Sequence, residues 1–153
     1  MASPTTGKSP TTVAVGEHCE MRVTFDAESI RTFAAMSGDW NPLHHDEAHA
    51  ARSRFGTIIA SGPQVASRMM GLEATYFSAR YDALGLENAF RFVRGVPAAT
   101  TLTLAWTVTA MAYKTSLAGH IVSIEGSAID DDGVVYVTGQ GTILLRDAPR
   151  ETG

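Results

Sequence analysis

The chain has a single cysteine, Cys19, in 153 residues, so no disulfide can form within it. It contains no apolar run long enough to cross a membrane and no signal-peptide pattern at its start. Its basic residues form no cluster and its net charge is -4, which disfavours binding to nucleic acid. These absences predict a cytoplasmic protein in a reducing environment, with neither a membrane nor a nucleic acid as a partner.

Two polar ends flank the part of the chain that suits a folded domain. Ser, Thr, Pro and Gly dominate residues 1–12, which we expect to be a disordered tail, and residues 147–153 are expected to be a loose C-terminal tail. Residues 13–146 contain no internal repeat, and their number suits one domain with one core. With 44% hydrophobic and 18% charged residues, the composition is typical of globular proteins.

The first part of this domain carries the signals of short helices. A strand over residues 19–25 leads to Asp26, which suits an N-cap, and apolar residues then recur at helical spacing to residue 36. An Asn-Pro pair disfavours continued helix, so residues 39–43 are expected to be a turn. Asp46 is expected to cap a second short helix over residues 47–55.

A longer helix opens at Gly62 and Pro63, because proline suits the first turn, where its missing N–H is not needed. Apolar residues recur every three or four positions to residue 77, with few charges, which predicts a mostly buried helix. The polar stretch 78–85 is expected to be a turn.

Period-two alternation marks the second half of the chain. It is clear over residues 101–113, weaker over 89–93, and returns over 120–129 and 134–145 on either side of an Asp-Asp-Gly turn. An antiparallel meander of about four strands therefore follows the helices. The predicted fold class is α+β, with a curved antiparallel sheet around one long apolar helix.

A polar cluster of Asp39, His44, His45, Asp46 and His49 spans the predicted turn and the start of the second helix. The simplest interpretation is a solvated loop in which Asp46 caps a helix and His45 and His49 are surface residues. A metal site is a second interpretation, because His45 and His49 would share one helical face. It lacks a clear third ligand, a cysteine pair and the glutamate of an HExxH motif.

Acid–base chemistry is the third interpretation. Asp39 and His44 lie five residues apart across a turn that can aim both side chains at one water molecule, so that proton removal and proton delivery are shared. Such a pair suits hydration or dehydration of a C=C bond next to a carbonyl. The charge that develops on the carbonyl oxygen needs backbone N–H donors, and Gly62 at the start of the apolar helix is the candidate, although a plain turn glycine would have the same spacing.

Three segments together resemble a known family. FAAMSGDWNPLHHD, then AARSRFGTIIASG, then a serine five residues past the glycine, resemble the MaoC-like hydratases, and most closely the (R)-specific enoyl-CoA hydratases, or hydratase 2. The strong similarity covers residues 25 to 67, and a looser one continues to about 145. The resemblance implies a hot-dog fold, a homodimer or dimer of dimers with sheets joined edge to edge, and no metal or redox cofactor.

The resemblance also assigns roles to residues. Asp39 and His44 fall on the catalytic pair that holds the water, and Gly62 falls on the glycine of the oxyanion hole. Asn41 falls on the asparagine that supports the loop, and Ser67 falls on a serine near the active site. The implied reaction is reversible hydration of a trans-2-enoyl-CoA to a (3R)-hydroxyacyl-CoA in fatty acid metabolism.

Two alternative functions stay open, a hot-dog acyl-CoA thioesterase and a non-catalytic acyl-CoA-binding subunit. The sequence departs from the family pattern where many relatives carry His in place of Ser61. It departs again where Gly95, Ala99 and Thr100 replace the expected Pro, Gly and Asp. These departures concern the acyl pocket and the sheet edge, so they leave the nature of the acyl group open.

Overall fold

A computed structural model describes residues 12–148. Its elements, in chain order, are β1 (His18–Phe25), α1 (Ala27–Ser37), the short 3-10 helix η1 (Pro42–His44), α2 (Glu47–Arg52), β2 (Ile59–Ala60), α3 (Gly62–Ser78), β3 (Tyr81–Phe92), β4 (Val96–Pro97), β5 (Thr100–Lys114), η2 (Thr115–Leu117), β6 (Gly119–Ile129) and β7 (Val135–Asp147). Most of both predicted tails, residues 1–11 and 149–153, lies outside the described residues. Strand β7 runs one residue past the predicted end of the domain.

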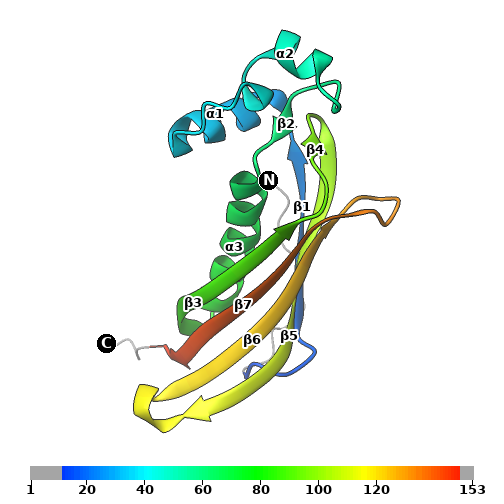
Figure 1. Cartoon of the computed structure of the whole chain (residues 1–153). Coiled ribbons are helices and arrows are strands. Elements are labelled where there is room, and N and C mark those ends of the chain that lie inside the picture. Colours follow the sequence, from blue (N-terminus) through cyan, green and yellow to red (C-terminus); the bar gives the residue numbers. More distant parts are fainter. Residues whose placement is uncertain (1–11, 149–153) are drawn as a thin grey trace.

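Five long strands form one antiparallel sheet in the order β1-β5-β6-β7-β3, and β2 pairs with β4 in a separate small sheet. The large sheet curves along the length of α3, while α1, η1 and α2 gather beyond the N-terminal end of that helix (Figure 1). A long helix held against a curved antiparallel sheet is the hot-dog arrangement, so the predicted α+β fold is confirmed.

The core lies between α3 and the sheet and is centred on Trp106. This indole is 1% exposed, and its Nε1–H donates to the carbonyl of Met69 in α3 at 2.8 Å. The ring needs the space that two glycines leave on the neighbouring strands, because a Cβ at Gly126 would lie 2.4 Å from it and one at Gly139 would lie 2.8 Å away. Residues of β5 alternate between buried and half-buried from Leu102 to Val108, so the apolar side chains of this strand face the core, as predicted.

The stretch 78–85 is not a polar turn, so this prediction is wrong. The chain turns within two residues after α3, and β3 begins at Tyr81. Strand β3 alternates between part-buried and exposed residues over 81–84 and again over 88–91, but a register shift between Gly85 and Glu87 interrupts the alternation. This interruption concealed the first half of the strand from a search for period-two alternation.

Two helix predictions also need correction. Helix α2 ends at Arg52 rather than at residue 55, because the Ser53 hydroxyl donates to the carbonyl of Ala50 and accepts the N–H of Phe55. Helix α3 is buried on one face only, and its Met70 is exposed. The initial helix α1 agrees with the prediction, with Asp26 as its N-cap.

Ala99 provides a test of backbone strain. It has a φ of 68°, in the left-handed region, and its N–H donates to the carbonyl of Phe25 at 2.8 Å. We expect Ala99→Gly to stabilise the fold by about 0.5–1 kcal/mol, because relief of the left-handed strain exceeds the entropy that glycine loses on folding. Urea unfolding measures the change. Ala112→Gly, within the extended strand β5, should destabilise instead, and equal effects at both positions would contradict the strain.

Glu73 is a buried acid, 4% exposed, between α3 and β3. Asn88 donates to its Oε1 at 2.9 Å, whereas Glu73 Oε2 and Asn88 Oδ1 have no hydrogen-bond partner among the described residues. Burial raises the pKa of Glu73, and the hydrogen bond from Asn88 opposes this only in part. Because the pKa is higher in the folded state, this group penalises folding increasingly as pH rises through that pKa.

We therefore expect Glu73→Gln, which is neutral at every pH, to raise the melting temperature above that of the wild type at neutral pH. The difference should shrink to nothing at about pH 4, where the acid is mostly protonated even when unfolded. Thermal unfolding followed by circular dichroism across this pH range tests the prediction. Glu125→Gln, on an exposed position, is the control, and a pH-independent gap for Glu73→Gln would contradict the account.

Candidate active site

Asp39 follows α1 and is held through its backbone and its side chain. Gly38 has a φ of 76° and ends the helix in the left-handed conformation, which glycine adopts without strain. The next N–H, that of Asp39, donates to the carbonyl of Ala34 at 2.9 Å. Asp39 Oδ1 accepts the N–H of Asn41 at 3.0 Å. The carboxylate therefore leaves the end of α1 in a fixed direction.

Asn41 shapes the turn between Asp39 and His44. Its side-chain oxygen caps η1 by accepting the N–H of Leu43 at 3.0 Å, and its carbonyl accepts the N–H of His44 at 2.9 Å. Pro42 occupies the first turn of this short helix, where the lack of an N–H carries no cost. The Asn-Pro signal in the sequence thus produces one tight turn that brings His44 back toward Asp39.

His44 is 5% exposed, and its two ring nitrogens face different partners. Nδ1 lies 2.8 Å from the carbonyl oxygen of Ile59, and Nε2 lies 3.3 Å from Asp39 Oδ2. A carbonyl only accepts hydrogen bonds, so Nδ1 carries a proton. The lone pair of neutral His44 is then on Nε2, facing a carboxylate whose side chain is 32% exposed. The pair has one buried base and one partner that solvent can reach.

Gly62 is the first residue of α3 and follows Ile59 by three positions. Because His44 Nδ1 binds the carbonyl of Ile59, the short strand β2 connects His44 to the start of α3. Ser61 caps the helix, its hydroxyl accepting the N–H of Gln64 at 3.3 Å. The N–H of Gly62 has no acceptor within residues 12–148, and the helix dipole makes this end electropositive. The ring of Phe92 covers Gly62 so closely that a Cβ there would lie 2.9 Å from it. An added side chain at Gly62 would require this half-exposed ring to move.

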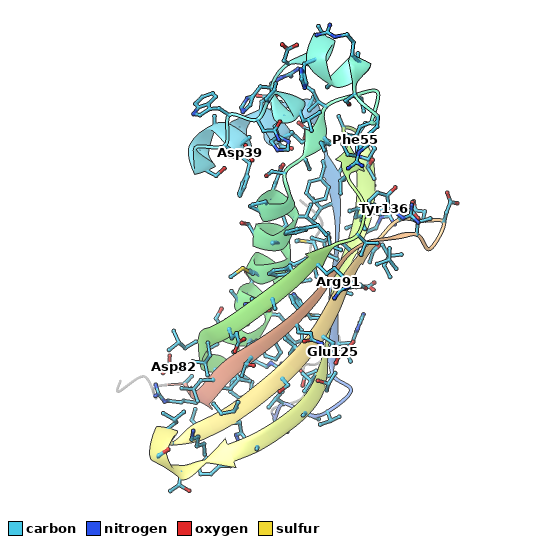
Figure 2. The ribbon with its side chains drawn as sticks, in the orientation of Figure 1. Asp39, Phe55, Asp82, Arg91, Glu125 and Tyr136 are labelled. Carbon is cyan, nitrogen blue, oxygen red and sulfur yellow. The ribbon has the colours of Figure 1, made fainter. Side chains whose placement is uncertain are left out.

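The structure brings Asp39, Asn41 and His44 together and connects them to Gly62. Asp39 lies where α1 ends, near the beginning of α3 (Figure 2). Ser67, by contrast, is exposed on α3 and makes no recorded contact with Asp39 or His44. Its position beside the site stays a prediction.

Sequence reasoning missed two residues of this site. Phe92 belongs to the edge strand β3, and only the fold places its ring on Gly62. His45 was expected at the surface, and that prediction is wrong: the residue is half-buried, and its Nε2 lies 2.7 Å from the carbonyl oxygen of Asp39. His49 is exposed and Asp46 caps α2, both as predicted. No pattern in the sequence distinguished His45 from His49.

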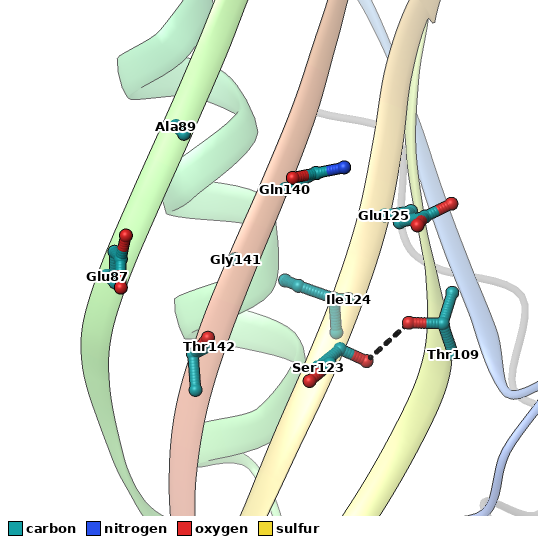
Figure 3. Close-up of a pocket in the computed structure, with 9 residues that line it drawn as sticks. All are labelled: Glu87, Ala89, Thr109, Ser123, Ile124, Glu125, Gln140, Gly141 and Thr142. Carbon is teal, nitrogen blue, oxygen red and sulfur yellow. Dashed lines mark hydrogen bonds between the residues drawn. The ribbon is translucent and has the colours of Figure 1, made fainter.

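Two hollows lie in the described surface. One, of about 250 Å³, is on the face of the sheet turned away from α3, lined by Glu87, Glu125, Gln140 and neighbouring residues (Figure 3). The other, of about 530 Å³, lies between β1, α1 and α3 and includes Phe33, Met36, Gln64 and Arg68. Asp39, His44 and Gly62 line neither hollow, but Met36 and Gln64 in the second one lie close in sequence to Asp39 and Gly62.

Neither a metal centre nor a membrane span emerges from residues 12–148. Within that range no three His, Cys, Asp or Glu side chains are grouped as metal ligands, and no helix is long and apolar enough to cross a membrane.

Two curated proteins are similar in sequence to part of this chain. Over 64 residues, 42% of this chain, the sequence is 39% identical to the (R)-specific enoyl-CoA hydratase of Aeromonas caviae. Over 69 residues, 45% of the chain, it is 32% identical to the mitochondrial 3-hydroxyacyl-[acyl-carrier-protein] dehydratase of Arabidopsis thaliana. The matches span 48% and 42% of these two proteins, which is less than half of each.

Similarity in three-dimensional structure extends over more of the chain. The unliganded R-hydratase of Pseudomonas aeruginosa superposes with a TM-score of 0.80 at 26% identity, over 89% of this chain and 84% of that one. The family of MaoC like domains matches residues 9–125. This match includes the whole Asp39–His44 turn and the start of α3, and the chain therefore belongs to the MaoC-like domain family.

Proposed function

We propose that the protein is a hydratase/dehydratase that adds water reversibly across the double bond of a trans-2-enoyl-CoA to give a (3R)-hydroxyacyl-CoA. The observation that carries the proposal is the Asp39–His44 pair, with Nε2 and Oδ2 3.3 Å apart. Membership of the MaoC-like family and similarity to hydratases support it. No electrons enter or leave the substrate in this reaction, so it requires no redox cofactor.

The pair has the chemistry that this reaction needs. A water bridging His44 Nε2 and the Asp39 carboxylate loses a proton to the pair while its oxygen bonds to C3. The C2=C3 electron pair moves toward the thioester, which becomes an enolate. A proton from the pair then bonds to C2, and the carbonyl re-forms. One water is consumed and the pair regains its starting state. Both new bonds form on one face of the double bond, because one pair serves both.

The enolate oxygen needs a donor while it carries negative charge. The N–H of Gly62 has no acceptor within the described chain and stands at the positive end of α3. A fixed backbone donor of this kind typically lowers a barrier by about 3 kcal/mol.

The groove between β1, α1 and α3 is the candidate acyl site. Its volume of about 530 Å³ falls within the range of small-molecule pockets, and its lining residues Met36 and Gln64 lie close in sequence to Asp39 and Gly62. Its lining mixes apolar side chains with Gln64, Arg68 and the carboxylates of Asp26 and Glu28, so an acyl group with a polar substituent fits its chemistry better than a plain alkyl chain.

Crotonyl-CoA tests the proposal. Loss of the enoyl absorbance on adding purified protein, with formation of 3-hydroxybutyryl-CoA, is the expected result. Release of free thiol from acyl-CoA, detected with Ellman's reagent, would instead indicate a hot-dog thioesterase. Tight acyl-CoA binding without turnover would indicate a non-catalytic subunit. The intact pair speaks against both alternatives, since neither requires a carboxylate and an imidazole that share one water.

A homodimer joined through the edge of β3 is the proposed assembly. This edge strand leaves Leu84 and Leu86 about half exposed, at 56% and 48%, and an unpaired apolar edge favours pairing with a second sheet. Light scattering after gel filtration should give twice the chain mass, and Leu84→Lys should shift the protein toward the monomer. A wild-type monomer at high concentration would contradict the proposed assembly.

A further inference from the structure

The second of the two adjacent histidines, His45, lies against the backbone of Asp39. Its Nε2 is 2.7 Å from the Asp39 carbonyl oxygen, which is shorter than most N–H···O hydrogen bonds. A carbonyl offers no proton, so Nε2 of His45 must carry one. His44, one residue earlier, carries its fixed proton on Nδ1, which lies 2.8 Å from the carbonyl of Ile59. In their neutral forms the two neighbours are therefore opposite tautomers.

This hydrogen bond completes the fixation of Asp39. The Asp39 N–H donates to Ala34, its Oδ1 accepts from Asn41, and its Oδ2 faces His44. The carbonyl oxygen is the one remaining polar group, and His45 binds it. That bond restrains the peptide after Asp39 and, through it, the position of Asn41, whose N–H binds Asp39 Oδ1; loss of the bond therefore loosens the carboxylate.

His45 is itself held on two sides. Its ring stacks on Trp40, with centroids 5.0 Å apart and planes 25° from parallel. Its carbonyl oxygen accepts a long hydrogen bond, 3.4 Å, from Nε of Arg31 in α1, and the same arginine forms an ion pair with Glu47. Trp40 is 70% exposed, so the stack shields His45 rather than filling a core. The backbone of His45 is thus tied to α1 through Arg31, which also pairs with Glu47 in α2, while its imidazole packs on Trp40.

We propose that His45 is a positioning residue, whose Nε2–H holds the carbonyl of Asp39 and thereby sets the carboxylate relative to His44. This inference rests on the proposed hydratase function. It assigns His45 no contact with substrate. Its effect arises because misplacement of a catalytic group by about 1 Å lowers turnover about 100-fold, so even a partial loosening is measurable.

Two substitutions separate the hydrogen bond from the stack. His45→Phe keeps a ring beside Trp40 but removes the donor. His45→Gln removes the ring but offers an amide N–H at similar reach. We expect His45→Phe to lower kcat on crotonyl-CoA about tenfold with little change in KM, and His45→Gln to recover most of that loss. His49→Phe, at an exposed histidine whose ring makes no recorded contact in residues 12–148, should match the wild type.

Nitrogen-15 NMR of the imidazole rings tests the same bond without turnover. We expect the neutral form of His45 to carry its proton on Nε2 and the neutral form of His44 to carry its proton on Nδ1. If the wild type does not turn over crotonyl-CoA, the proposed function fails. The position of the proton on the His45 ring then still shows whether the hydrogen bond to the Asp39 carbonyl is present. A proton on Nδ1 of His45, wild-type kcat in His45→Phe, or equal losses in the Phe and Gln variants would each overturn the inference.

Discussion

Asp39→Asn should lower kcat for hydration of crotonyl-CoA by about 100-fold or more, the usual contribution of a positioned acid–base group. Asparagine keeps an oxygen that can accept the N–H of Asn41, so the turn is preserved. It replaces the carboxylate oxygen beside His44 Nε2, 3.3 Å away, with an amide group that cannot take a proton from water. Initial rates measured by loss of enoyl absorbance give the effect.

His44 needs a more careful variant, because it is 5% exposed and donates to a buried carbonyl. His44→Ala would leave the Ile59 oxygen without a partner and would confuse stability with catalysis. His44→Asn offers an amide N–H in place of Nδ1 but lacks Nε2, and we expect the same large loss of kcat from it. Wild-type rates in both Asp39→Asn and His44→Asn, in folded protein, would refute the acid–base pair.

Gly62→Pro should lower kcat about 100- to 1,000-fold relative to Gly62→Ala, because only proline removes the N–H that stabilises the enolate. The backbone permits the change. Gly62 is the first residue of α3, where proline is common, and Ser61 has a φ of -67° and a ψ of 147°, which suits a residue before proline. Comparing the two variants cancels the effect of the added Cβ, which both share.

The crowding by Phe92 has to be relieved first, since a Cβ at Gly62 would lie 2.9 Å from its ring. Both substitutions are therefore made in a Phe92→Ala background, with that single variant as the reference. Crotonyl-CoA kinetics then report the N–H alone. If the proline and alanine variants turn over equally fast, Gly62 is not the donor to the enolate oxygen.

Much of the fold was predictable because its signals are local. The N-caps Asp26 and Asp46, and the glycine and proline that open α3, each act within one turn of helix. The alternation that places β5 on the core likewise needs only its own residues. The first half of strand β3 was not predicted because a register shift between Gly85 and Glu87 breaks its alternation, and pairing with β7 across that irregularity is not visible in the local sequence.

The contacts of the candidate site likewise divide into those that the local sequence predicts and those that it does not. The contact between Asp39 and His44 follows from five residues and one Asn-Pro turn, so the motif predicts it. The contact of Phe92 with Gly62 joins residues 30 positions apart, and no local pattern encodes it. His45 differs from His49 only because η1 turns its ring back onto the Asp39 carbonyl. Such bonds depend on tertiary geometry, which spacing does not reveal.

Hydration in water labelled with oxygen-18 tests the central claim most directly, because it reports where the oxygen of water goes. The protein is incubated with crotonyl-CoA and the products are analysed by mass spectrometry. The account predicts an intact CoA thioester that is heavier by one labelled water, with the oxygen-18 on C3. Free CoA together with crotonate labelled in its carboxylate would contradict it, because water would then have attacked the thioester carbon.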